Sequence, residues 1–130
     1  MKLKVYDSGV KTAAAASEAF KTDFINGKII KIQIKNSAST GYKIYCDASD
    51  VGTQSLNDEY ILGTSGAVVT VATALNIYPV AVREIAAGTG ITATGNIYDQ
   101  FVVNEALQVD ITSLTAADTY QVLIWYEAAE

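Results

Sequence analysis

Strict two-residue alternation is the feature that most constrains what this chain can fold into. From residue 30 to residue 35, apolar and polar side chains alternate without exception: Ile30, Ile32 and Ile34 against Lys31, Gln33 and Lys35. Successive side chains of a strand point to opposite faces, so this pattern predicts a half-buried strand of an antiparallel sheet. Residues 42–47 alternate likewise, after a turn-forming stretch at 36–41.

The rest of the chain has similar short runs of strand-forming residues. Further strands are expected over 60–62, 67–71, 77–83, 97–103, 107–111 and 120–126. A tight hairpin turn is expected at Asn104 and Glu105. Val, Ile and Thr together account for 38 residues, which also favours β-structure. We therefore predict an all-β fold, an antiparallel β-sandwich or jelly-roll-like barrel of about eight or nine short strands with an extended N-terminal segment.

The length of 130 residues indicates one domain. Residues 1–25 are expected to form an N-terminal arm, or a first strand followed by an alanine-rich segment, and residues 26–130 a single β-sandwich domain. Within the first part, residues 12–19 are compatible either with one or two helical turns or with an extended arm.

Composition excludes several kinds of chemistry. The chain has no His and a single cysteine, Cys46, so it lacks His acid–base catalysis, His metal ligands and any intrachain disulfide or thiolate zinc site. No run of apolar residues reaches the length of a transmembrane helix. Charged residues interrupt residues 1–20, so we expect no signal peptide there. We expect the chain to be synthesised in the cytoplasm. We expect no catalytic residues, no cofactor and no bound metal.

Charge is divided unevenly along the chain. Residues 1–43 hold all eight lysines and three acids, a net charge of +5, whereas residues 44–130 hold one arginine and eleven acids, a net charge of −10. This asymmetry indicates a segment that attaches to an acidic partner, or head-to-tail contact between copies. The lysines are spaced singly, and the overall pI is about 4.6, which argues against nucleic acid as the partner.

Two motifs are weak. The glycines of 88–90 resemble a fragment of a phosphate-binding loop, but no helix is expected after them, and a strand-connecting loop is the favoured interpretation. Four acids, Asp47, Asp50, Asp58 and Glu59, could offer oxygen ligands to Ca²⁺. Their spacing matches no known calcium loop, so solvated carboxylates in a turn are favoured.

The last predicted strand carries the only tryptophan of the chain. Leu123 and Trp125 are expected on the face opposite Val122, Ile124 and Tyr126. An exposed tryptophan on a β-sandwich can stack against a sugar, but burial in a second core or a subunit interface is the favoured interpretation.

The order of elements resembles that of small β-sandwich virion proteins of tailed bacteriophages and related viruses. The matching segments are 26–32 (NGKIIKI), 77–83 (IYPVAVR), 87–92 (AGTGIT), 97–111 (IYDQFVVNEALQVDI) and 120–127 (YQVLIWYE). The chain departs from the pattern at Asn104 and Glu105, where Gly is more usual, and in its alanine-rich residues 12–19. The resemblance implies a non-enzymatic capsid decoration or cement protein on the outer surface of the virion. It also implies that the chain binds the major capsid protein and favours a homotrimer. From the charge pattern and the lack of a long apolar run, we expect no contact with nucleic acid or membrane.

The residues expected at a capsid or subunit interface are Lys2, Lys4, Lys11, Leu123 and Trp125. Changing the three lysines together to Glu is expected to lower capsid occupancy and its sensitivity to salt. The alternative function is a carbohydrate-binding module of a phage tail or fibre, with Trp125 as its platform.

Overall fold

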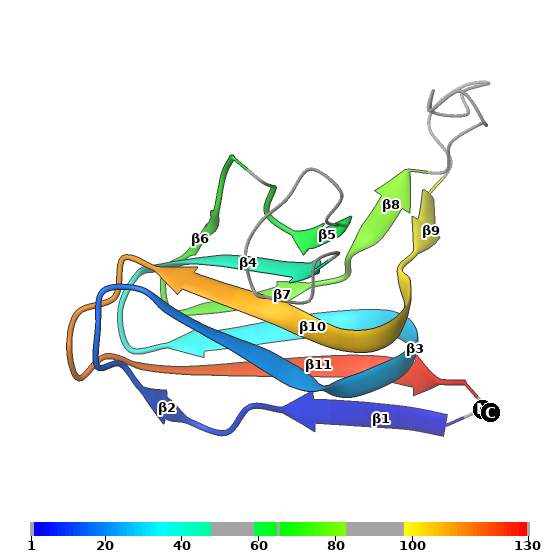
Figure 1. The fold of residues 1–130 in the computed structure, drawn as a ribbon, viewed down its shortest axis with the longest axis horizontal. Coiled ribbons are helices and arrows are strands. Elements are labelled where there is room, and N and C mark those ends of the chain that lie inside the picture. Colours follow the sequence, from blue (N-terminus) through cyan, green and yellow to red (C-terminus); the bar gives the residue numbers. More distant parts are fainter. Residues whose placement is uncertain (1, 48–58, 65, 83–97, 130) are drawn as a thin grey trace.

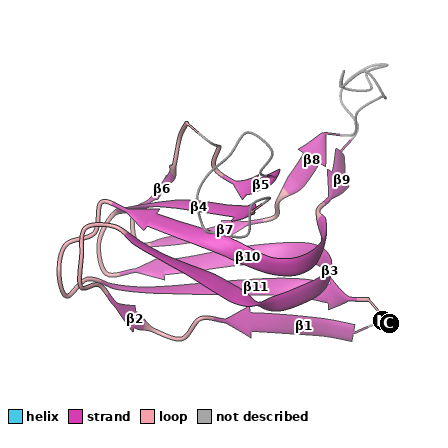
Figure 2. Cartoon of the chain, in the orientation of Figure 1, coloured by secondary structure: helices cyan, strands magenta, loops and turns pink. Residues whose placement is uncertain are grey.

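The computed structural model describes residues 2–47, 59–64, 66–82 and 98–129. Every regular element within these residues is a strand, joined to the next by loops or turns (Figure 2). The prediction of an all-β fold is therefore confirmed. In chain order the strands are β1 (Lys2–Asp7), β2 (Lys11–Thr12), β3 (Glu18–Asn36), β4 (Thr40–Cys46), β5 (Glu59–Leu62), β6 (Val69–Val71), β7 (Ala74–Ile77), β8 (Val80–Val82), β9 (Tyr98–Gln100), β10 (Val102–Thr112) and β11 (Thr119–Ala128).

Nine of these strands form one continuous antiparallel sheet (Figure 1). Its main order is β1-β11-β3-β10-β4-β5, while β2 pairs with β11, β6 with β4, and β7 with β3. Strands β8 and β9 form a separate two-stranded ribbon. The expected set of uniformly short strands is wrong in one respect, because β3 alone is 19 residues long and belongs to two parts of the sheet.

The long strand β3 pairs with different partners along its two halves. Residues 18–28 pair with β10, and residues 27–36 pair with β11. The ribbon of β3 curves back on itself between these halves (Figure 1). Its pairing slips twice, near Thr22 opposite β10 and at Ile30 opposite β11. Each slip gives β3 one extra residue, a β-bulge, and bulges bend and twist a strand. The bulges therefore help one strand to join two arms of the sheet, one that contains β10 and one that contains β11.

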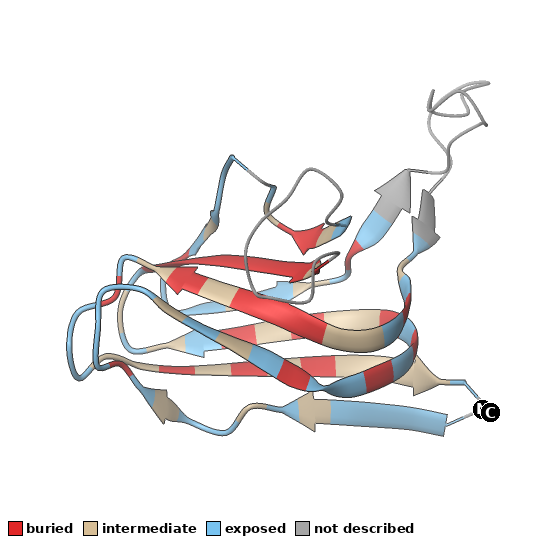
Figure 3. Cartoon of the chain, in the orientation of Figure 1, coloured by how far each residue is buried: buried red, intermediate tan, exposed pale blue. Residues whose placement is uncertain are grey.

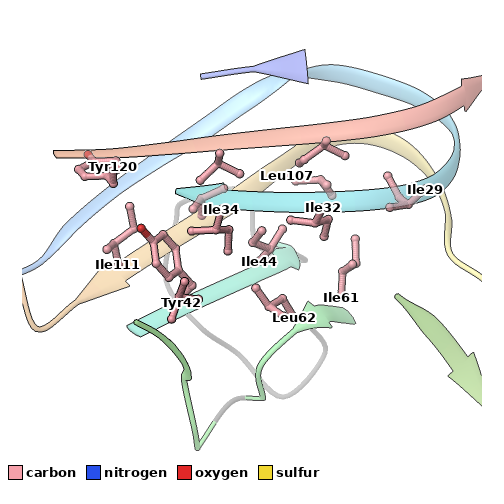
Figure 4. Close-up of a cluster of buried hydrophobic side chains, with 14 of the residues drawn as sticks. Ile29, Ile32, Ile34, Tyr42, Ile44, Ile61, Leu62, Leu107, Ile111 and Tyr120 are labelled. Atoms are coloured by element: carbon pink, nitrogen blue, oxygen red, sulfur yellow. The ribbon is translucent and has the colours of Figure 1, made fainter. Parts of the chain in front are cut away.

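One hydrophobic core lies between the arms (Figure 4). The side chains of Ile32 and Ile34 of β3 point toward Ile44 of β4 and Leu107 of β10. Buried residues alternate with more accessible ones along much of β3 and in the first half of β11 (Figure 3). The expected alternation is wrong for β4, where six of the seven residues are buried. The period-two prediction is thus confirmed for Ile32 and Ile34. At the bulge the burial pattern changes, and Ile29 rather than Ile30 is fully buried.

Two sequence-based expectations about turns are wrong. No hairpin forms at Asn104 and Glu105, because β10 runs without interruption through both and they pair with Asn26 and Ile25 of β3. The expected strand over 77–83 is split at Pro79, which lies between β7 and β8. Proline lacks the N–H that a sheet ladder requires, which accounts for the break.

The N-terminal segment belongs to the sheet. Both β1 and β2 pair with β11, and Ala13 is buried in the core. The expected division between residues 25 and 26 falls inside β3. Residues 13–17 form a loop rather than a helical turn, and Glu18 begins β3. Among the described residues there is no helix that could cross a membrane.

Candidate interaction face on β1, β11 and β3

The alternation of β11 separates a buried face from an outward face. Val122 and Ile124 are fully buried in the core, whereas Leu123 and Trp125 are half-buried and point the other way. Because β11 lies between β1 and β3, its outward side chains share a surface with side chains of both neighbours. We call this surface, made by the outward residues of β1, β11 and β3, the outer face.

The register of the three strands decides which residues meet on the outer face. Trp125 lies opposite Val5 of β1 on one side and Lys31 of β3 on the other. In the next row, Leu123 lies opposite Asp7 and Gln33.

On the other side of the Trp125 row, Glu127 lies opposite Leu3 and Lys28. Beyond the Leu123 row, Gln121 lies opposite Lys35. The outer face therefore has an apolar strip along β1 and β11 beside a lysine row along β3. The apolar strip consists of Leu3, Val5, Leu123 and Trp125, and the lysine row of Lys28, Lys31 and Lys35.

The two strips touch at Trp125. The Lys31 ammonium lies 4.7 Å from the centre of the indole ring, within the range of a cation–π contact. The β1 part of the apolar strip is accessible to solvent, since Leu3 is 65% exposed and Val5 is 47% exposed. Figure 3 shows that β1 is exposed along nearly its whole length. Large apolar side chains exposed side by side are typical of a surface that binds a partner.

Asp7 closes one end of the apolar strip. Its Oδ1 accepts hydrogen bonds from the Gln121 side-chain amide and the Gly9 backbone N–H, each at 2.8 Å. The bond from Gln121, followed by that from Gly9, lowers the pKa of this carboxyl below its ordinary value. Asp7 is therefore held in place at the edge of the outer face.

The five residues expected at an interface do not lie on one surface. Leu123 and Trp125 lie together on the outer face. Lys2 and Lys4 alternate with the outward Leu3 and Val5 along β1, so they point to the opposite side of that strand.

Lys11 is in β2, with its ammonium 4.9 Å from the centre of the Phe20 ring, away from Trp125 in the sheet. The lysines beside Trp125 were not among the expected site residues. The signal for two of them was present, because Lys31 and Lys35 alternate with buried isoleucines, but the sequence does not show that β3 pairs with β11.

A buried polar network lies on the face of β4 and β10 opposite the hydrophobic core. The Tyr45 hydroxyl donates to Asp110 Oδ2 at 2.7 Å, and the Gln108 amide donates to Asp110 Oδ1 at 3.0 Å. Tyr45 is fully buried, and burial, followed by the bond to Asp110, raises its pKa. Beside this network is an open pocket of about 310 Å³, lined by residues that include Glu18, Lys43 and Asp110. Both oxygens of Asp110 already accept bonds within the protein, so the network ties β4 to β10.

The two weak motifs lie mainly outside the described residues. This applies to residues 88–90 and, of the four acids, to Asp50 and Asp58. Asp47 is buried, and Glu59 is exposed at the start of β5. In the described part of the chain, no three His, Cys, Asp or Glu side chains are grouped so that they could hold a metal ion.

No family model, no curated protein and no solved structure matches this chain. The resemblance to virion proteins stays a prediction from the order and composition of the strands.

Proposed function

We propose that this chain is a non-enzymatic virion protein, a capsid decoration or cement protein that binds the outer surface of the major capsid protein lattice and stabilises the head. The observation that supports this most is the outer face, where an exposed apolar strip runs beside a lysine row. Such a surface suits attachment to a protein that is itself acidic and partly apolar. The resemblance over residues 26 to 130 supports the same function.

Attachment to a lattice also suits a small binding surface. A single face three strands wide makes few contacts, and the entropy lost on association offsets much of the free energy that these contacts gain. We therefore expect a modest affinity for one copy. Copies joined as a homotrimer would bind three lattice sites at once, and the high effective concentration after the first contact raises the overall affinity. The homotrimer is part of the proposal.

The test is co-sedimentation of the purified chain with shells of the major capsid protein from the virus that encodes it. We expect saturable binding in simple ratio to the shell protein, with occupancy reduced in Trp125→Ala and falling as salt rises. The matched control is Phe24→Ala, which removes an aromatic side chain that is 62% exposed on β3 outside the outer face. The absence of saturable binding by the wild-type chain would overturn the proposal.

Carbohydrate binding on a phage tail or fibre is the alternative function. A tryptophan platform needs an open ring face, whereas the Lys31 ammonium lies over the ring of Trp125. The structure therefore favours the decoration protein. Specific signals on a glycan array that vanish in Trp125→Ala, together with no binding to shells, would favour the carbohydrate module.

A further inference from the structure

We infer that Lys31 and Trp125 form one recognition unit, which selects a protein partner that presents a row of carboxylates beside a row of apolar side chains. This inference rests on the proposed function and names the chemistry of the surface that the outer face would bind. Its basis is the arrangement of the two strips and the contact that joins them.

The geometry of the lysine row sets the spacing of the partner's acids. Lys28, Lys31 and Lys35 lie along β3, so the row spans roughly 20 Å at about 3.3 Å per residue. The apolar strip on β11 runs beside it at one strand spacing, about 4.8 Å. An extended segment with carboxylates on one edge and aliphatic side chains on the other matches both strips at once.

Lys31 is placed to act with Trp125 rather than alone. One side of its ammonium faces the indole ring, and an ammonium has three N–H donors, so donors remain for a carboxylate outside the protein. The ring in turn holds the ammonium near one position, which reduces the side-chain entropy lost when a partner binds. A carboxylate bound to Lys31 would bring its neighbouring side chain over Trp125 and Val5.

The charges on the outer face favour an acidic protein over a nucleic acid. Asp7 and Glu127 lie on the same face as the lysine row, and both would repel a continuous phosphate backbone. A discontinuous set of carboxylates can approach the lysine row and avoid these two acids. The partner's acids should therefore be concentrated on the side that meets β3.

The tryptophan makes the inference directly measurable. Trp125 is the only tryptophan in the chain, so its emission reports on the outer face without interference from another site. The full chain would be titrated with a short synthetic peptide of alternating Glu and Val. The same peptide with Gln in place of Glu, and a duplex DNA oligonucleotide, would serve as the comparison probes.

We expect the acidic peptide to change the emission of Trp125 saturably, with an affinity that falls as salt rises. Lys31→Glu should weaken this affinity by about tenfold or more, because it places like charges together. Lys31→Arg should retain it, since a guanidinium keeps both the charge and the stacking on the ring. Lys21→Glu, an exposed lysine in the part of β3 that pairs with β10, is the matched charge control and should bind as the wild type does.

Three results would overturn the inference: equal affinity for the Gln peptide, equal affinity for DNA, or unchanged affinity in Lys31→Glu. Urea unfolding of each variant establishes that a loss of affinity is not a loss of folding. The same variants in the shell assay separate this inference from the proposed function. Shells that bind wild type and Lys31→Glu equally would remove the recognition unit and leave the decoration function intact. A chain that binds the acidic peptide but not shells would remove the decoration function and leave the recognition unit intact.

Discussion

Gly27 of β3 lies against the backbone of β11 at Glu127, so closely that a Cβ on this glycine would be 2.2 Å from the Glu127 carbonyl oxygen. Gly27 pairs with Val103 of β10 and also with Ala128 of β11. It therefore marks the point where β3 passes from one arm of the sheet to the other. Only a residue without a side chain permits this close approach of two backbones.

Gly27→Ala should destabilise the fold by about 3 kcal/mol, at the upper end for overpacking, because the obstructing atoms belong to the backbone and cannot move aside as a side chain can. Urea unfolding followed by Trp125 fluorescence measures the loss. Gly66→Ala is the matched control, since a Cβ at Gly66 meets nothing within 4 Å. Equal midpoints for the two variants would show that β3 can shift away from β11.

The bulge of β3 near Thr22 supplies a second test. The Leu107 N–H of β10 donates to the Thr22 hydroxyl at 2.9 Å, where a regular ladder would provide a backbone carbonyl. Thr22→Val keeps the shape of the side chain but removes this acceptor, leaving a buried N–H unpaired at a cost of about 1–3 kcal/mol. Thr22→Ser retains the hydroxyl and should keep more of the stability. Hydrogen exchange at the Leu107 amide should accelerate in Thr22→Val, and unchanged protection there would contradict the assignment.

The link between β4 and β10 is tested at Tyr45. Tyr45→Phe removes the hydroxyl that donates to Asp110, and a bond to a charged group contributes about 1.5–3 kcal/mol. Thermal or urea denaturation should show a loss of that size. Tyr78→Phe removes the same hydroxyl from a tyrosine that is 66% exposed, and it should leave stability within about 0.5 kcal/mol of the wild type. Similar losses in both variants would mean that the bond to Asp110 contributes little.

Stability should fall in acid because of Glu18 and Asp7. The Ala14 N–H, followed by the Tyr120 hydroxyl, donates to Glu18 and lowers its pKa below the ordinary 4.5. The pKa of Asp7 is likewise below 3.8. The unfolded chain therefore takes up these protons at higher pH than the folded chain does. The stabilisation is complete above the ordinary values and is lost as pH falls through them to the lower folded values.

The measurement is the urea midpoint between about pH 6 and pH 2 at constant ionic strength. We expect Glu18→Gln and Asp7→Asn each to be less stable than wild type at neutral pH and to lose less on acidification. The variant with both substitutions is the decisive comparison. If its stability falls as steeply in acid as that of the wild type, other groups cause the pH dependence.

The part of the fold that could be predicted from sequence is the part that depends on neighbouring residues alone. Alternation along a strand is local, because successive Cβ atoms must point to opposite faces. It correctly assigned Ile32 and Ile34 to the core, and Leu123 and Trp125 to the face opposite Val122. The same local logic failed at Asn104, where pairing with Asn26 of β3 kept β10 extended in place of the expected turn.

What only the tertiary structure decided is which strands are neighbours and in which register. The position of Lys31 beside Trp125 depends on β3 pairing with β11, and these residues are far apart in the chain. The bulge at Ile30 likewise belongs to the pairing of β3 with β11, because it is one extra residue of β3 between the partners of Trp125 and Tyr126. Strand pairing comes from hydrogen bonds and burial summed over the whole sheet, and local propensity does not specify those sums. The sequence alone thus determined that this is an all-β chain with its tryptophan on the face opposite Val122, and the sheet determined that this face is outward and that a lysine lies over the ring.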